Sequence, residues 1–412
     1  MRATPHAIRE PLAATRTVRA GLGSDRHHGA VVPPIHLSSN FTFEGFDQPR
    51  RYDYTRSGNP TRDLLAEALA TSEGGSQAVV TATGMAAVYL ALQPLNPGDL
   101  LIAPFDCYGG THRLLSACAR RQHFRVRFVD LSDPAACTAA IAERPKMVWV
   151  ETPSNPLLRI TDIRAICHQA RKVGALVAVD NTFLSPVLQQ PLELGADLVV
   201  HSTTKYLNGH SDVVGGAVIA RDQQLGEDLA WWGNCLGMTG APFDSYLTLR
   251  GLRTLHARMR CHLENTAELV SVLEESPAVE RVYYPGLSDH PGHAVAAAQQ
   301  SAFGAMLSFE LTGGRREVEA FLDGLRFFSL AESLGGVESL VAHPSTMTHA
   351  AMDPEARDRA GIRDSLLRLS VGIEASADLV ADIEAGLERA RAAGRHLTPV
   401  QAESCGRASC AF

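Results

Sequence analysis

The segment "VDNTFLSPVLQQPLELGADLVVHSTTKYLNGHSDVVGG", residues 179–216, is the stretch from which the fold and the chemistry can be inferred. It contains Lys205, one of only three lysines among the 38 lysine and arginine residues of the chain. Arginine therefore supplies nearly all of the positive charge, yet a lysine stands here among hydroxyls, histidines and glycines. A nucleophilic amine has to be lysine, because arginine does not deprotonate in proteins. The segment predicts a catalytic amine at Lys205.

Short apolar runs on both sides of Lys205 predict a mostly parallel sheet. They are rich in β-branched residues and alternate with helical patterns such as residues 163–174. This alternation is typical of an α/β domain whose sheet is buried on both faces. Strands are expected at residues 78–83, 100–104, 124–130, 147–151, 175–180, 197–202 and 215–220. We therefore expect one large α/β domain over residues 61–255.

The rest of the chain divides into an arm, a second domain and a tail. Residues 1–60 are rich in proline, glycine and serine and lack periodicity, which predicts an extended arm. Residues 256–395 are expected to form a smaller α+β domain, and residues 396–412 a disordered tail. The patterns behind the second domain are a long helical stretch at 243–276, apolar runs at 304–311 and 366–372, and a helix at 376–393.

Composition excludes several classes of partner. The 412 residues are 45% hydrophobic and 20% charged, which is typical of a globular protein. The net charge of −7, without a basic stripe, disfavours nucleic acid or a membrane surface as the main partner. No apolar run approaches the roughly 18 residues that span a bilayer. The eight cysteines form no CxxC pair, so we expect reduced thiols, a cytoplasmic protein and no metal site.

Further residues around Lys205 fit pyridoxal 5′-phosphate (PLP), the commonest carbonyl partner of a catalytic lysine. Asp180 ends a predicted buried strand, and the PLP ring nitrogen needs a carboxylate. The stretch "TATGMAAV" (81–88) ends a strand and opens a helix, so Gly84 and Met85 are expected to offer N–H groups to the phosphate. Hydroxyls beside the lysine, on Ser202 and Thr204, would add to this phosphate site.

Other interpretations of these residues fit less well. "STTK" (202–205) matches the SxxK pair of penicillin-binding hydrolases, but that class also needs a KTG element, and Lys205 is the last lysine. His201 and His210 lack metal-ligand spacing and a third ligand. Taken singly, Asp180 could cap a helix and Gly84 could form a turn. The order of glycine-led helix, aspartate and lysine favours PLP.

Longer segments identify the chain as a member of the Cys/Met-metabolism PLP enzymes. The resemblance covers about residues 15–395. It is carried by the Asp180-to-Lys205 block and by "YDYTRSGNPTRDLLAEALA" (52–70), "DCYGGTHRLL" (106–115), "ETPSNPLLRITDI" (151–163), "AWWGNCLGMTG" (230–240), "LAESLGGVESL" (330–340) and "LLRLSVGIE" (366–374). It implies a PLP-dependent transferase fold of type I, similar to aspartate aminotransferase. It also implies PLP as cofactor and a homotetramer built as a dimer of dimers.

The resemblance assigns further roles at the cofactor. Tyr108 would stack on the pyridine ring and, with Tyr54, influence the protonation of Lys205. Tyr54 and Arg56 would reach the PLP phosphate of a neighbouring subunit, which would explain an arm without periodicity. From the residues alone, no partner for Arg56 within its own chain is evident.

The resemblance also predicts the substrate site. Arg368 would hold the substrate α-carboxylate through two hydrogen bonds, and Asn155 would support it. Glu332 and Ser333 would line the amino-acid pocket, and Arg113 would meet the distal carboxylate.

The implied reaction is a γ-replacement that converts O-succinyl-L-homoserine and L-cysteine to L-cystathionine and succinate. The segment 230–240 favours replacement over elimination, and the acyl group is left open. The alternatives are a cystathionine γ-lyase, an O-acylhomoserine sulfhydrylase, or a PLP-bound regulatory protein. Intact Lys205 and Asp180 argue against the last of these.

Overall fold

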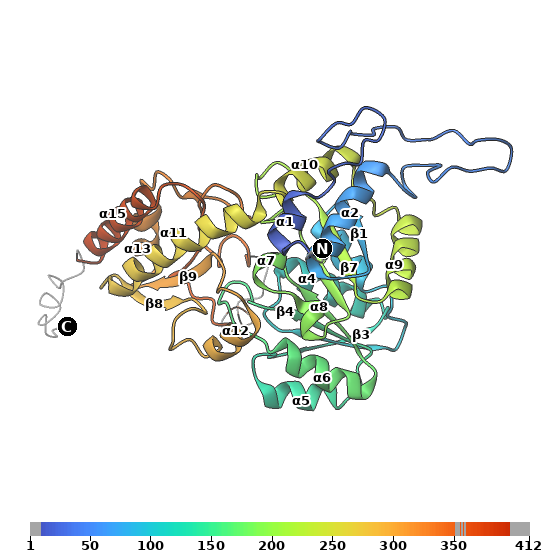
Figure 1. The fold of residues 1–412 in the computed structure, drawn as a ribbon. Coiled ribbons are helices and arrows are strands. Elements are labelled where there is room, and N and C mark those ends of the chain that lie inside the picture. The colour runs from blue at the N-terminus through green and yellow to red at the C-terminus, as the bar shows by residue number, and fades with distance from the viewer. Residues whose placement is uncertain (1–9, 351–354, 356, 358–359, 396–412) are drawn as a thin grey trace, which may run out of the picture.

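The computed structural model describes residues 10–350, 355, 357 and 360–395 and contains two β-sheets (Figure 1). The first sheet comprises β1 (Gln77–Thr81), β2 (Leu100–Pro104), β3 (Arg125–Val129), β4 (Met147–Glu151), β5 (Leu176–Asp180), β6 (Leu198–His201) and β7 (Gly216–Ala220). Their order is β1-β7-β6-β5-β4-β2-β3, and only β7 runs antiparallel to its neighbours. The seven predicted strands and the mostly parallel sheet are confirmed.

Helices cover both faces of this sheet, and the side chains of each strand alternate between two cores. One face packs against α2 (Pro60–Glu73), α5 (Pro134–Ile141) and α6 (Ile163–Val173). The other packs against α3 (Gly84–Ala91), α4 (Gly109–Arg120) and α9 (Gln223–Leu236). Val177 and Val179 belong to the first core, whereas Ala178 belongs to the second. Because the side-chain period of a strand is two, Asp180 faces the α3 side and Asn181 the α2 side.

Two short helices, α7 (Ser185–Leu188) and α8 (Pro191–Leu194), connect β5 to β6. Helices α10 (Pro242–Leu252) and α11 (Leu255–Glu275) then lead out of the first sheet, where the sequence predicted one long helical stretch. The break follows from the Gly251 carbonyl, which accepts the Thr254 N–H, the Thr254 hydroxyl and Arg258 Nη2. These bonds replace continued helical hydrogen bonding at that turn.

The second sheet lies beyond α11 in the order β10-β11-β12-β9-β8. Its strands are β8 (Val279–Tyr283), β9 (Met306–Leu311), β10 (Ser329–Leu330), β11 (Leu340–Ala342) and β12 (Leu366–Ser370). Helices α12 (His293–Gln299), α13 (Arg315–Leu322) and α15 (Ser376–Arg395) accompany it, and α13 packs against α15. Figure 1 shows this second body beside the first, with α11 extending from one to the other. An α+β region therefore follows the first sheet.

The N-terminal arm is extended except for one short helix, α1 (Ala13–Val18). Figure 1 shows much of it as a long loop that projects past α2 and α10. Its apolar side chains Leu37, Phe43 and Phe46 are exposed, Phe46 completely. The tail predicted at 396–412 lies outside the described residues. Within the described ranges, no helix is long and apolar enough to cross a membrane.

Candidate active site

The candidate site lies where the carboxyl ends of β4, β5 and β6 meet the N-termini of α3 and α4. In open α/β sheets this edge is where ligands bind. Lys205 follows β6, Asp180 ends β5, and Gly84 begins α3. Residues far apart in the sequence are therefore gathered at one edge of the first sheet.

Lys205 is held by a residue of the second body. Its Nζ donates a hydrogen bond of 2.7 Å to Ser333 Oγ. Burial and the nearby Arg368 charge together lower the pKa of Lys205 to about 8, against an opposing effect of Glu332. The neutral amine, which a nucleophile or base requires, is therefore far more accessible than in an ordinary lysine.

Arg368 lies on β12 and is almost completely buried. Its Nη1 donates to Asn155 Oδ1 at 2.9 Å and its Nη2 to the Ser333 carbonyl oxygen at 2.9 Å. Its Nε has no hydrogen-bond partner among the described residues. Burial lowers the pKa of the guanidinium to about 10. A buried cation with an unpaired N–H donor favours the binding of an anion, such as a carboxylate.

Ser333 bonds both residues: its hydroxyl oxygen accepts from Lys205 Nζ, and its carbonyl oxygen accepts from Arg368 Nη2. Its backbone has φ 94°, in the left-handed region that residues other than glycine seldom adopt. Such strain persists where surrounding contacts fix the backbone, and it is concentrated at functional sites. The contacts of Ser333 bring an amine and a guanidinium to one place.

Asp180 accepts a hydrogen bond from the Thr182 N–H at 3.0 Å, while burial raises its pKa. Glu151 lies beside it, because the two residues are register partners on β4 and β5. Burial and the Asp180 charge raise the pKa of Glu151 well above its usual range, and its Oε2 accepts the Tyr108 N–H at 2.9 Å. Glu151 was not predicted as a site residue, although it ends the run "MVWVE" just as Asp180 ends its own strand.

Gly84 and Ser202 form a close cradle at the start of α3. A Cβ placed on Gly84 would lie 2.8 Å from Ser202 Cβ and 2.9 Å from its Oγ. Thr83 caps the helix by accepting the Ala86 N–H on Oγ1. The first N–H groups of a helix have no partner within it and favour an anion. The Thr204 hydroxyl instead bonds both the carbonyl oxygen and the N–H of Gly215, so it braces this loop.

Tyr108 presents an exposed ring at the start of α4; its side chain is 45% exposed. A Cβ on Gly110 would lie 2.5 Å from the Tyr108 ring and 2.9 Å from Met85 Sδ. The ring, Met85 and Gly110 are therefore close together, beside the N-termini of α3 and α4. This is an apolar, planar surface on which an aromatic ligand can stack.

Four predicted residues are not hydrogen-bonded to this group within the described part of the chain. Arg56 Nη1 donates to the Asn234 carbonyl oxygen and to Asn234 Oδ1, so it has a partner in its own chain, contrary to expectation. Tyr54 is half exposed and lies under the Arg56 guanidinium. Arg113 is exposed on α4. Glu332 is exposed and acts on Lys205 and Arg368 only through its charge.

Two buried histidines near the candidate site were not predicted as functional groups. His201 was considered only as a metal ligand, yet it is buried against Glu73. His349 is also buried, and burial together with the Arg368 charge lowers its pKa to about 4. Neither has a recognisable sequence motif. Across the described ranges, no group of three metal-binding side chains comes together.

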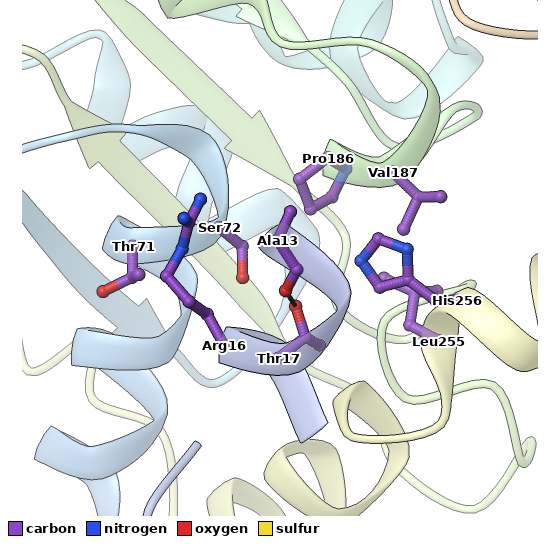
Figure 2. A pocket seen from close by; sticks show the side chains of 9 residues that line it. All are labelled: Ala13, Arg16, Thr17, Thr71, Ser72, Pro186, Val187, Leu255 and His256. Carbon is purple, nitrogen blue, oxygen red and sulfur yellow. Dashed lines mark hydrogen bonds between the residues drawn. The ribbon is translucent and has the colours of Figure 1, made fainter. Parts of the chain in front are cut away.

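A separate pocket lies between α1, the C-terminal end of α2, α7 and the start of α11. Figure 2 shows its lining: Ala13, Arg16, Thr17, Thr71, Ser72, Pro186, Val187, Leu255 and His256. None of the residues predicted for catalysis or binding contributes to it. It is therefore not the candidate active site.

Comparison with known proteins identifies the family. The sequence model of the Cys/Met metabolism PLP-dependent enzymes matches residues 14–388. The chain belongs to this family. Cystathionine γ-synthase of Escherichia coli is 58% identical over 92% of this chain and 98% of its own. A cystathionine β-lyase of Lactococcus lactis is 46% identical over 91% of this chain and 98% of its own.

Solved structures agree with the family assignment. Cystathionine γ-synthase from Xanthomonas oryzae pv. oryzae, in complex with aminoacrylate and cysteine, is 61% identical with a TM-score of 0.93. The similarity covers 93% of this chain and 100% of that one. The same enzyme has been solved with cystathionine, with a TM-score of 0.92. The type I PLP fold predicted from the sequence is confirmed.

PLP is the cofactor of this family, and the residues of this chain fit it. An amine of lowered pKa, a buried carboxylate, a glycine cradle at a helix N-terminus and an exposed tyrosine ring lie at one sheet edge. The amine matches the PLP aldehyde and the carboxylate matches its ring nitrogen. The glycine cradle matches the phosphate, and the tyrosine ring matches the face of the PLP ring. Lys205, Asp180, Gly84 and Tyr108 are the residues that would hold it.

Proposed function

We propose that the chain converts O-succinyl-L-homoserine and L-cysteine to L-cystathionine and succinate. The observation that carries this proposal is the pair of bonds at Ser333, which link the Lys205 amine to the Arg368 guanidinium. An amino acid whose carboxylate binds Arg368 would present its Cα to the lysine. The 58% identity to the E. coli γ-synthase supports this choice of reaction.

Arg368 and Asn155 orient the substrate. The free Nε–H of Arg368 and reorganisation of its Nη bonds would let the guanidinium bind an α-carboxylate through two hydrogen bonds. Asn155 Oδ1 accepts a hydrogen bond from Arg368 Nη1 and so fixes the plane of the guanidinium. Because the arginine is buried, water competes little for its donors.

Asp180, Tyr108 and the α3 N-terminus position the cofactor, which when bound serves as an electron sink for negative charge at the substrate carbons. Asp180 holds a proton at the ring nitrogen. Tyr108 packs on the ring face. The N–H groups of Gly84 and Met85, with the Ser202 hydroxyl, bind the phosphate.

Lys205 moves the protons of the reaction. Its amine takes the proton at substrate Cα, and its flexible chain also reaches Cβ on the same face. Loss of the Cβ proton accompanies cleavage of the Cγ–O bond, and the electron pair leaves with succinate. The cysteine thiol then forms the Cγ–S bond after giving up its proton, and protons return to Cβ and Cα from the lysine ammonium.

Elimination is the second candidate, because lyases are also similar to this chain. Cystathionine γ-lyase from Lactobacillus plantarum is 42% identical with a TM-score of 0.90. Elimination would share the first proton transfers and differ in what reacts at Cγ. Without a thiol, the same residues would release 2-oxobutyrate, ammonia and succinate.

The deciding experiment is a cysteine titration at fixed O-succinylhomoserine, with 2-oxobutyrate and cystathionine both measured. A bound thiol has a high effective concentration at Cγ, so saturating cysteine should suppress 2-oxobutyrate and divert most flux to cystathionine. Serine in place of cysteine, and the Lys205→Ala variant, serve as controls. Dominant 2-oxobutyrate at saturating cysteine, with faster cleavage than synthesis of cystathionine, would assign the chain as a lyase.

We further propose a homotetramer, a dimer of dimers in which the arm of one subunit completes the site of its neighbour. Exposed apolar side chains of the arm, including Phe43 and Phe46, support this proposal. So do Trp231 on α9 and Phe243 on α10, which are more than half exposed. An apolar surface of this kind is typical of subunit contacts.

A cytoplasmic location is also proposed. The described cysteines, Cys107, Cys118, Cys137, Cys167, Cys235 and Cys261, are all free thiols. Free thiols are usual in a reducing compartment.

A further inference from the structure

A buried aspartate lies between two loops of the candidate site. Asp106 follows β2 and precedes Tyr108 and α4, and its side chain is 7% exposed. Its Oδ2 accepts a 2.7 Å hydrogen bond from Ser154 Oγ, in the loop after β4 that also carries Asn155. The reaction described above does not use Asp106. One carboxylate oxygen thus joins the loop of the Tyr108 ring to the loop of Asn155.

Arg159 extends this contact to a third segment. Its Nη1 donates to the same Asp106 oxygen at 2.9 Å, and its Nη2 donates to the Ala360 carbonyl oxygen at 3.0 Å. Ala360 lies on the chain that leads into β12, the strand of Arg368. A hydrogen bond between a guanidinium and a carboxylate is roughly twice as strong as a neutral one. The ion pair therefore contacts both loops and the approach to β12.

The loop after β4 is closed by hydrogen bonds between its two ends. The Ser154 N–H donates to the Arg159 carbonyl oxygen at 2.9 Å, and the Arg159 N–H donates to Ser154 Oγ at 3.3 Å. The Leu158 N–H donates to the Ser154 carbonyl oxygen at 3.0 Å. Asn155 lies inside this closed turn. A shift of Ser154 would therefore move Asn155, whose Oδ1 accepts from Arg368 Nη1.

Apolar packing holds the same three segments together. Phe105 directly precedes Asp106, and the centroid of its ring lies 5.1 Å from Arg159 Cζ, a distance typical of a cation–π contact. The Phe105 ring also packs against a small buried cluster formed by Leu157, Ala360, Ile362 and Leu366. The position of the ion pair is thus fixed by packing as well as by charge.

We propose that Asp106 and Arg159 are positioning residues that fix the cofactor ring relative to the substrate carboxylate. Tyr108 would orient the ring from one loop, while Asn155 and Arg368 would hold the carboxylate from the other two segments. This relation decides which bond at substrate Cα is aligned with the ring for cleavage. The inference rests on the functions proposed above for Tyr108, Asn155 and Arg368. A purely structural role would stabilise the fold without affecting this relation.

The test uses two ligands that differ by one carboxylate, glycine and methylamine, on the PLP-loaded enzyme. Both amines react with the bound cofactor, so absorbance titration gives a dissociation constant for each. The ratio of the glycine constant to the methylamine constant isolates the carboxylate site. We expect Asp106→Asn and Arg159→Met each to raise this ratio about tenfold, because small displacements of positioned groups have effects of this order or larger. The visible circular dichroism of bound PLP, which depends on the orientation of its ring, should change in both variants.

Arg389→Met is the matched control. Arg389 on α15 is also half-buried, and it donates to the Ala320 and Phe321 carbonyl oxygens, far from the candidate site in the second body. This variant should lower the Tm without changing the ratio or the circular dichroism. Ser154→Ala removes one bond and keeps the ion pair, so it provides a milder variant if Asp106→Asn folds poorly. It should raise the ratio as well, by less.

Arg368→Met separates this inference from the proposed function. If the ratio rises in Arg368→Met but in neither Asp106→Asn nor Arg159→Met, the positioning role is wrong and the carboxylate site stands. If the ratio does not rise in Arg368→Met, both are wrong. Unchanged circular dichroism in Asp106→Asn and Arg159→Met would also overturn the proposal, because the ring would then be held independently of the ion pair. A raised ratio in all three variants, and not in Arg389→Met, supports it.

Discussion

At the scale of single residues, the chemistry depends on how the protein lowers the pKa of one lysine amine. Lys205 loses hydration by burial and faces the charge of Arg368. Both effects disfavour the ammonium form, and Ser333 Oγ accepts one of its hydrogen bonds. The guanidinium proposed to bind substrate therefore also lowers the pKa of the Lys205 amine.

This arrangement predicts how PLP attachment depends on pH. Only the neutral amine attacks the cofactor aldehyde, and the pKa of Lys205 is lowered to about 8. The attachment rate of the apoenzyme, followed by absorbance, should rise with pH and level off above a midpoint near pH 8. Arg368→Met removes a repelling charge and should move the midpoint upward. Arg164→Met, on the exposed face of α6, is the matched control, and an unchanged midpoint in Arg368→Met would contradict this account.

The rarity of lysine and the order of Gly84, Asp180 and Lys205 led to a candidate site, and the structure gathers these three residues at one edge of the first sheet. Glu151 was not predicted, because its position beside Asp180 depends on which strands are neighbours. Glu151 matters only once β4 is known to pair with β5. The partner of Arg56 within its own chain was also missed, because Asn234 is remote in sequence.

At the scale of elements, the start of α3 is the most constrained part of the site. Thr83 caps the helix, and Gly84 leaves no room for a side chain against Ser202. The close approach leaves the first N–H groups of α3 accessible to an anion. The end of β1, the start of α3 and the Ser202 hydroxyl after β6 thus form the cradle in which the phosphate is expected to bind.

Gly84→Ala is expected to weaken PLP binding by an order of magnitude, because its Cβ would lie 2.8 Å from Ser202 Cβ and force the helix end to move. Gly314→Ala is the matched control, since nothing lies within 4 Å of its Cβ. Cofactor titration monitored by fluorescence measures both variants. Equal affinity in both would show that the close contact at Gly84 does not shape the phosphate site.

Strands were easier to predict than helix ends. The seven strands of the first sheet are apolar on both faces, so short β-branched runs mark them without reference to their neighbours. The break between α10 and α11 depends on Arg258 and Thr254 reaching the Gly251 carbonyl. Such bonds follow from tertiary packing and leave little trace in periodicity.

At the scale of the whole molecule, the site is divided between bodies and, as proposed, between subunits. Lys205 and Asp180 belong to the first sheet, whereas Arg368 and Ser333 belong to the second sheet and its connections. Arg56 and Tyr54 lie on the arm, where Arg56 bonds Asn234 on α9 of its own body, while much of the arm projects past α2 and α10 (Figure 1). A complete site therefore requires more than one folded unit.

Subunit mixing tests the proposed sharing. Arg56→Ala and Lys205→Ala should each be nearly inactive. After exchange at equal amounts, about a quarter of sites would combine a wild-type Lys205 with a neighbour's wild-type Arg56, so partial activity should return. Mixing Lys205→Ala with Asp180→Asn is the control and should recover none, because both residues belong to the same subunit's site. No recovery in the first mixture, despite exchange shown by mass spectrometry, would contradict sharing.

The bond between Lys205 and Ser333 crosses from one sheet to the other, which bears on how such enzymes diverge. In the proposed reaction, proton transfer depends on the first sheet, while recognition of the amino acid depends on residues attached to the second. Substitutions near Ser333 can thus change which substrate is accepted without disturbing Lys205 or Asp180. A duplicated gene could acquire a new specificity through a few changes in one half of the protein. Relatives as similar as 46% that are named as lyases fit such a history.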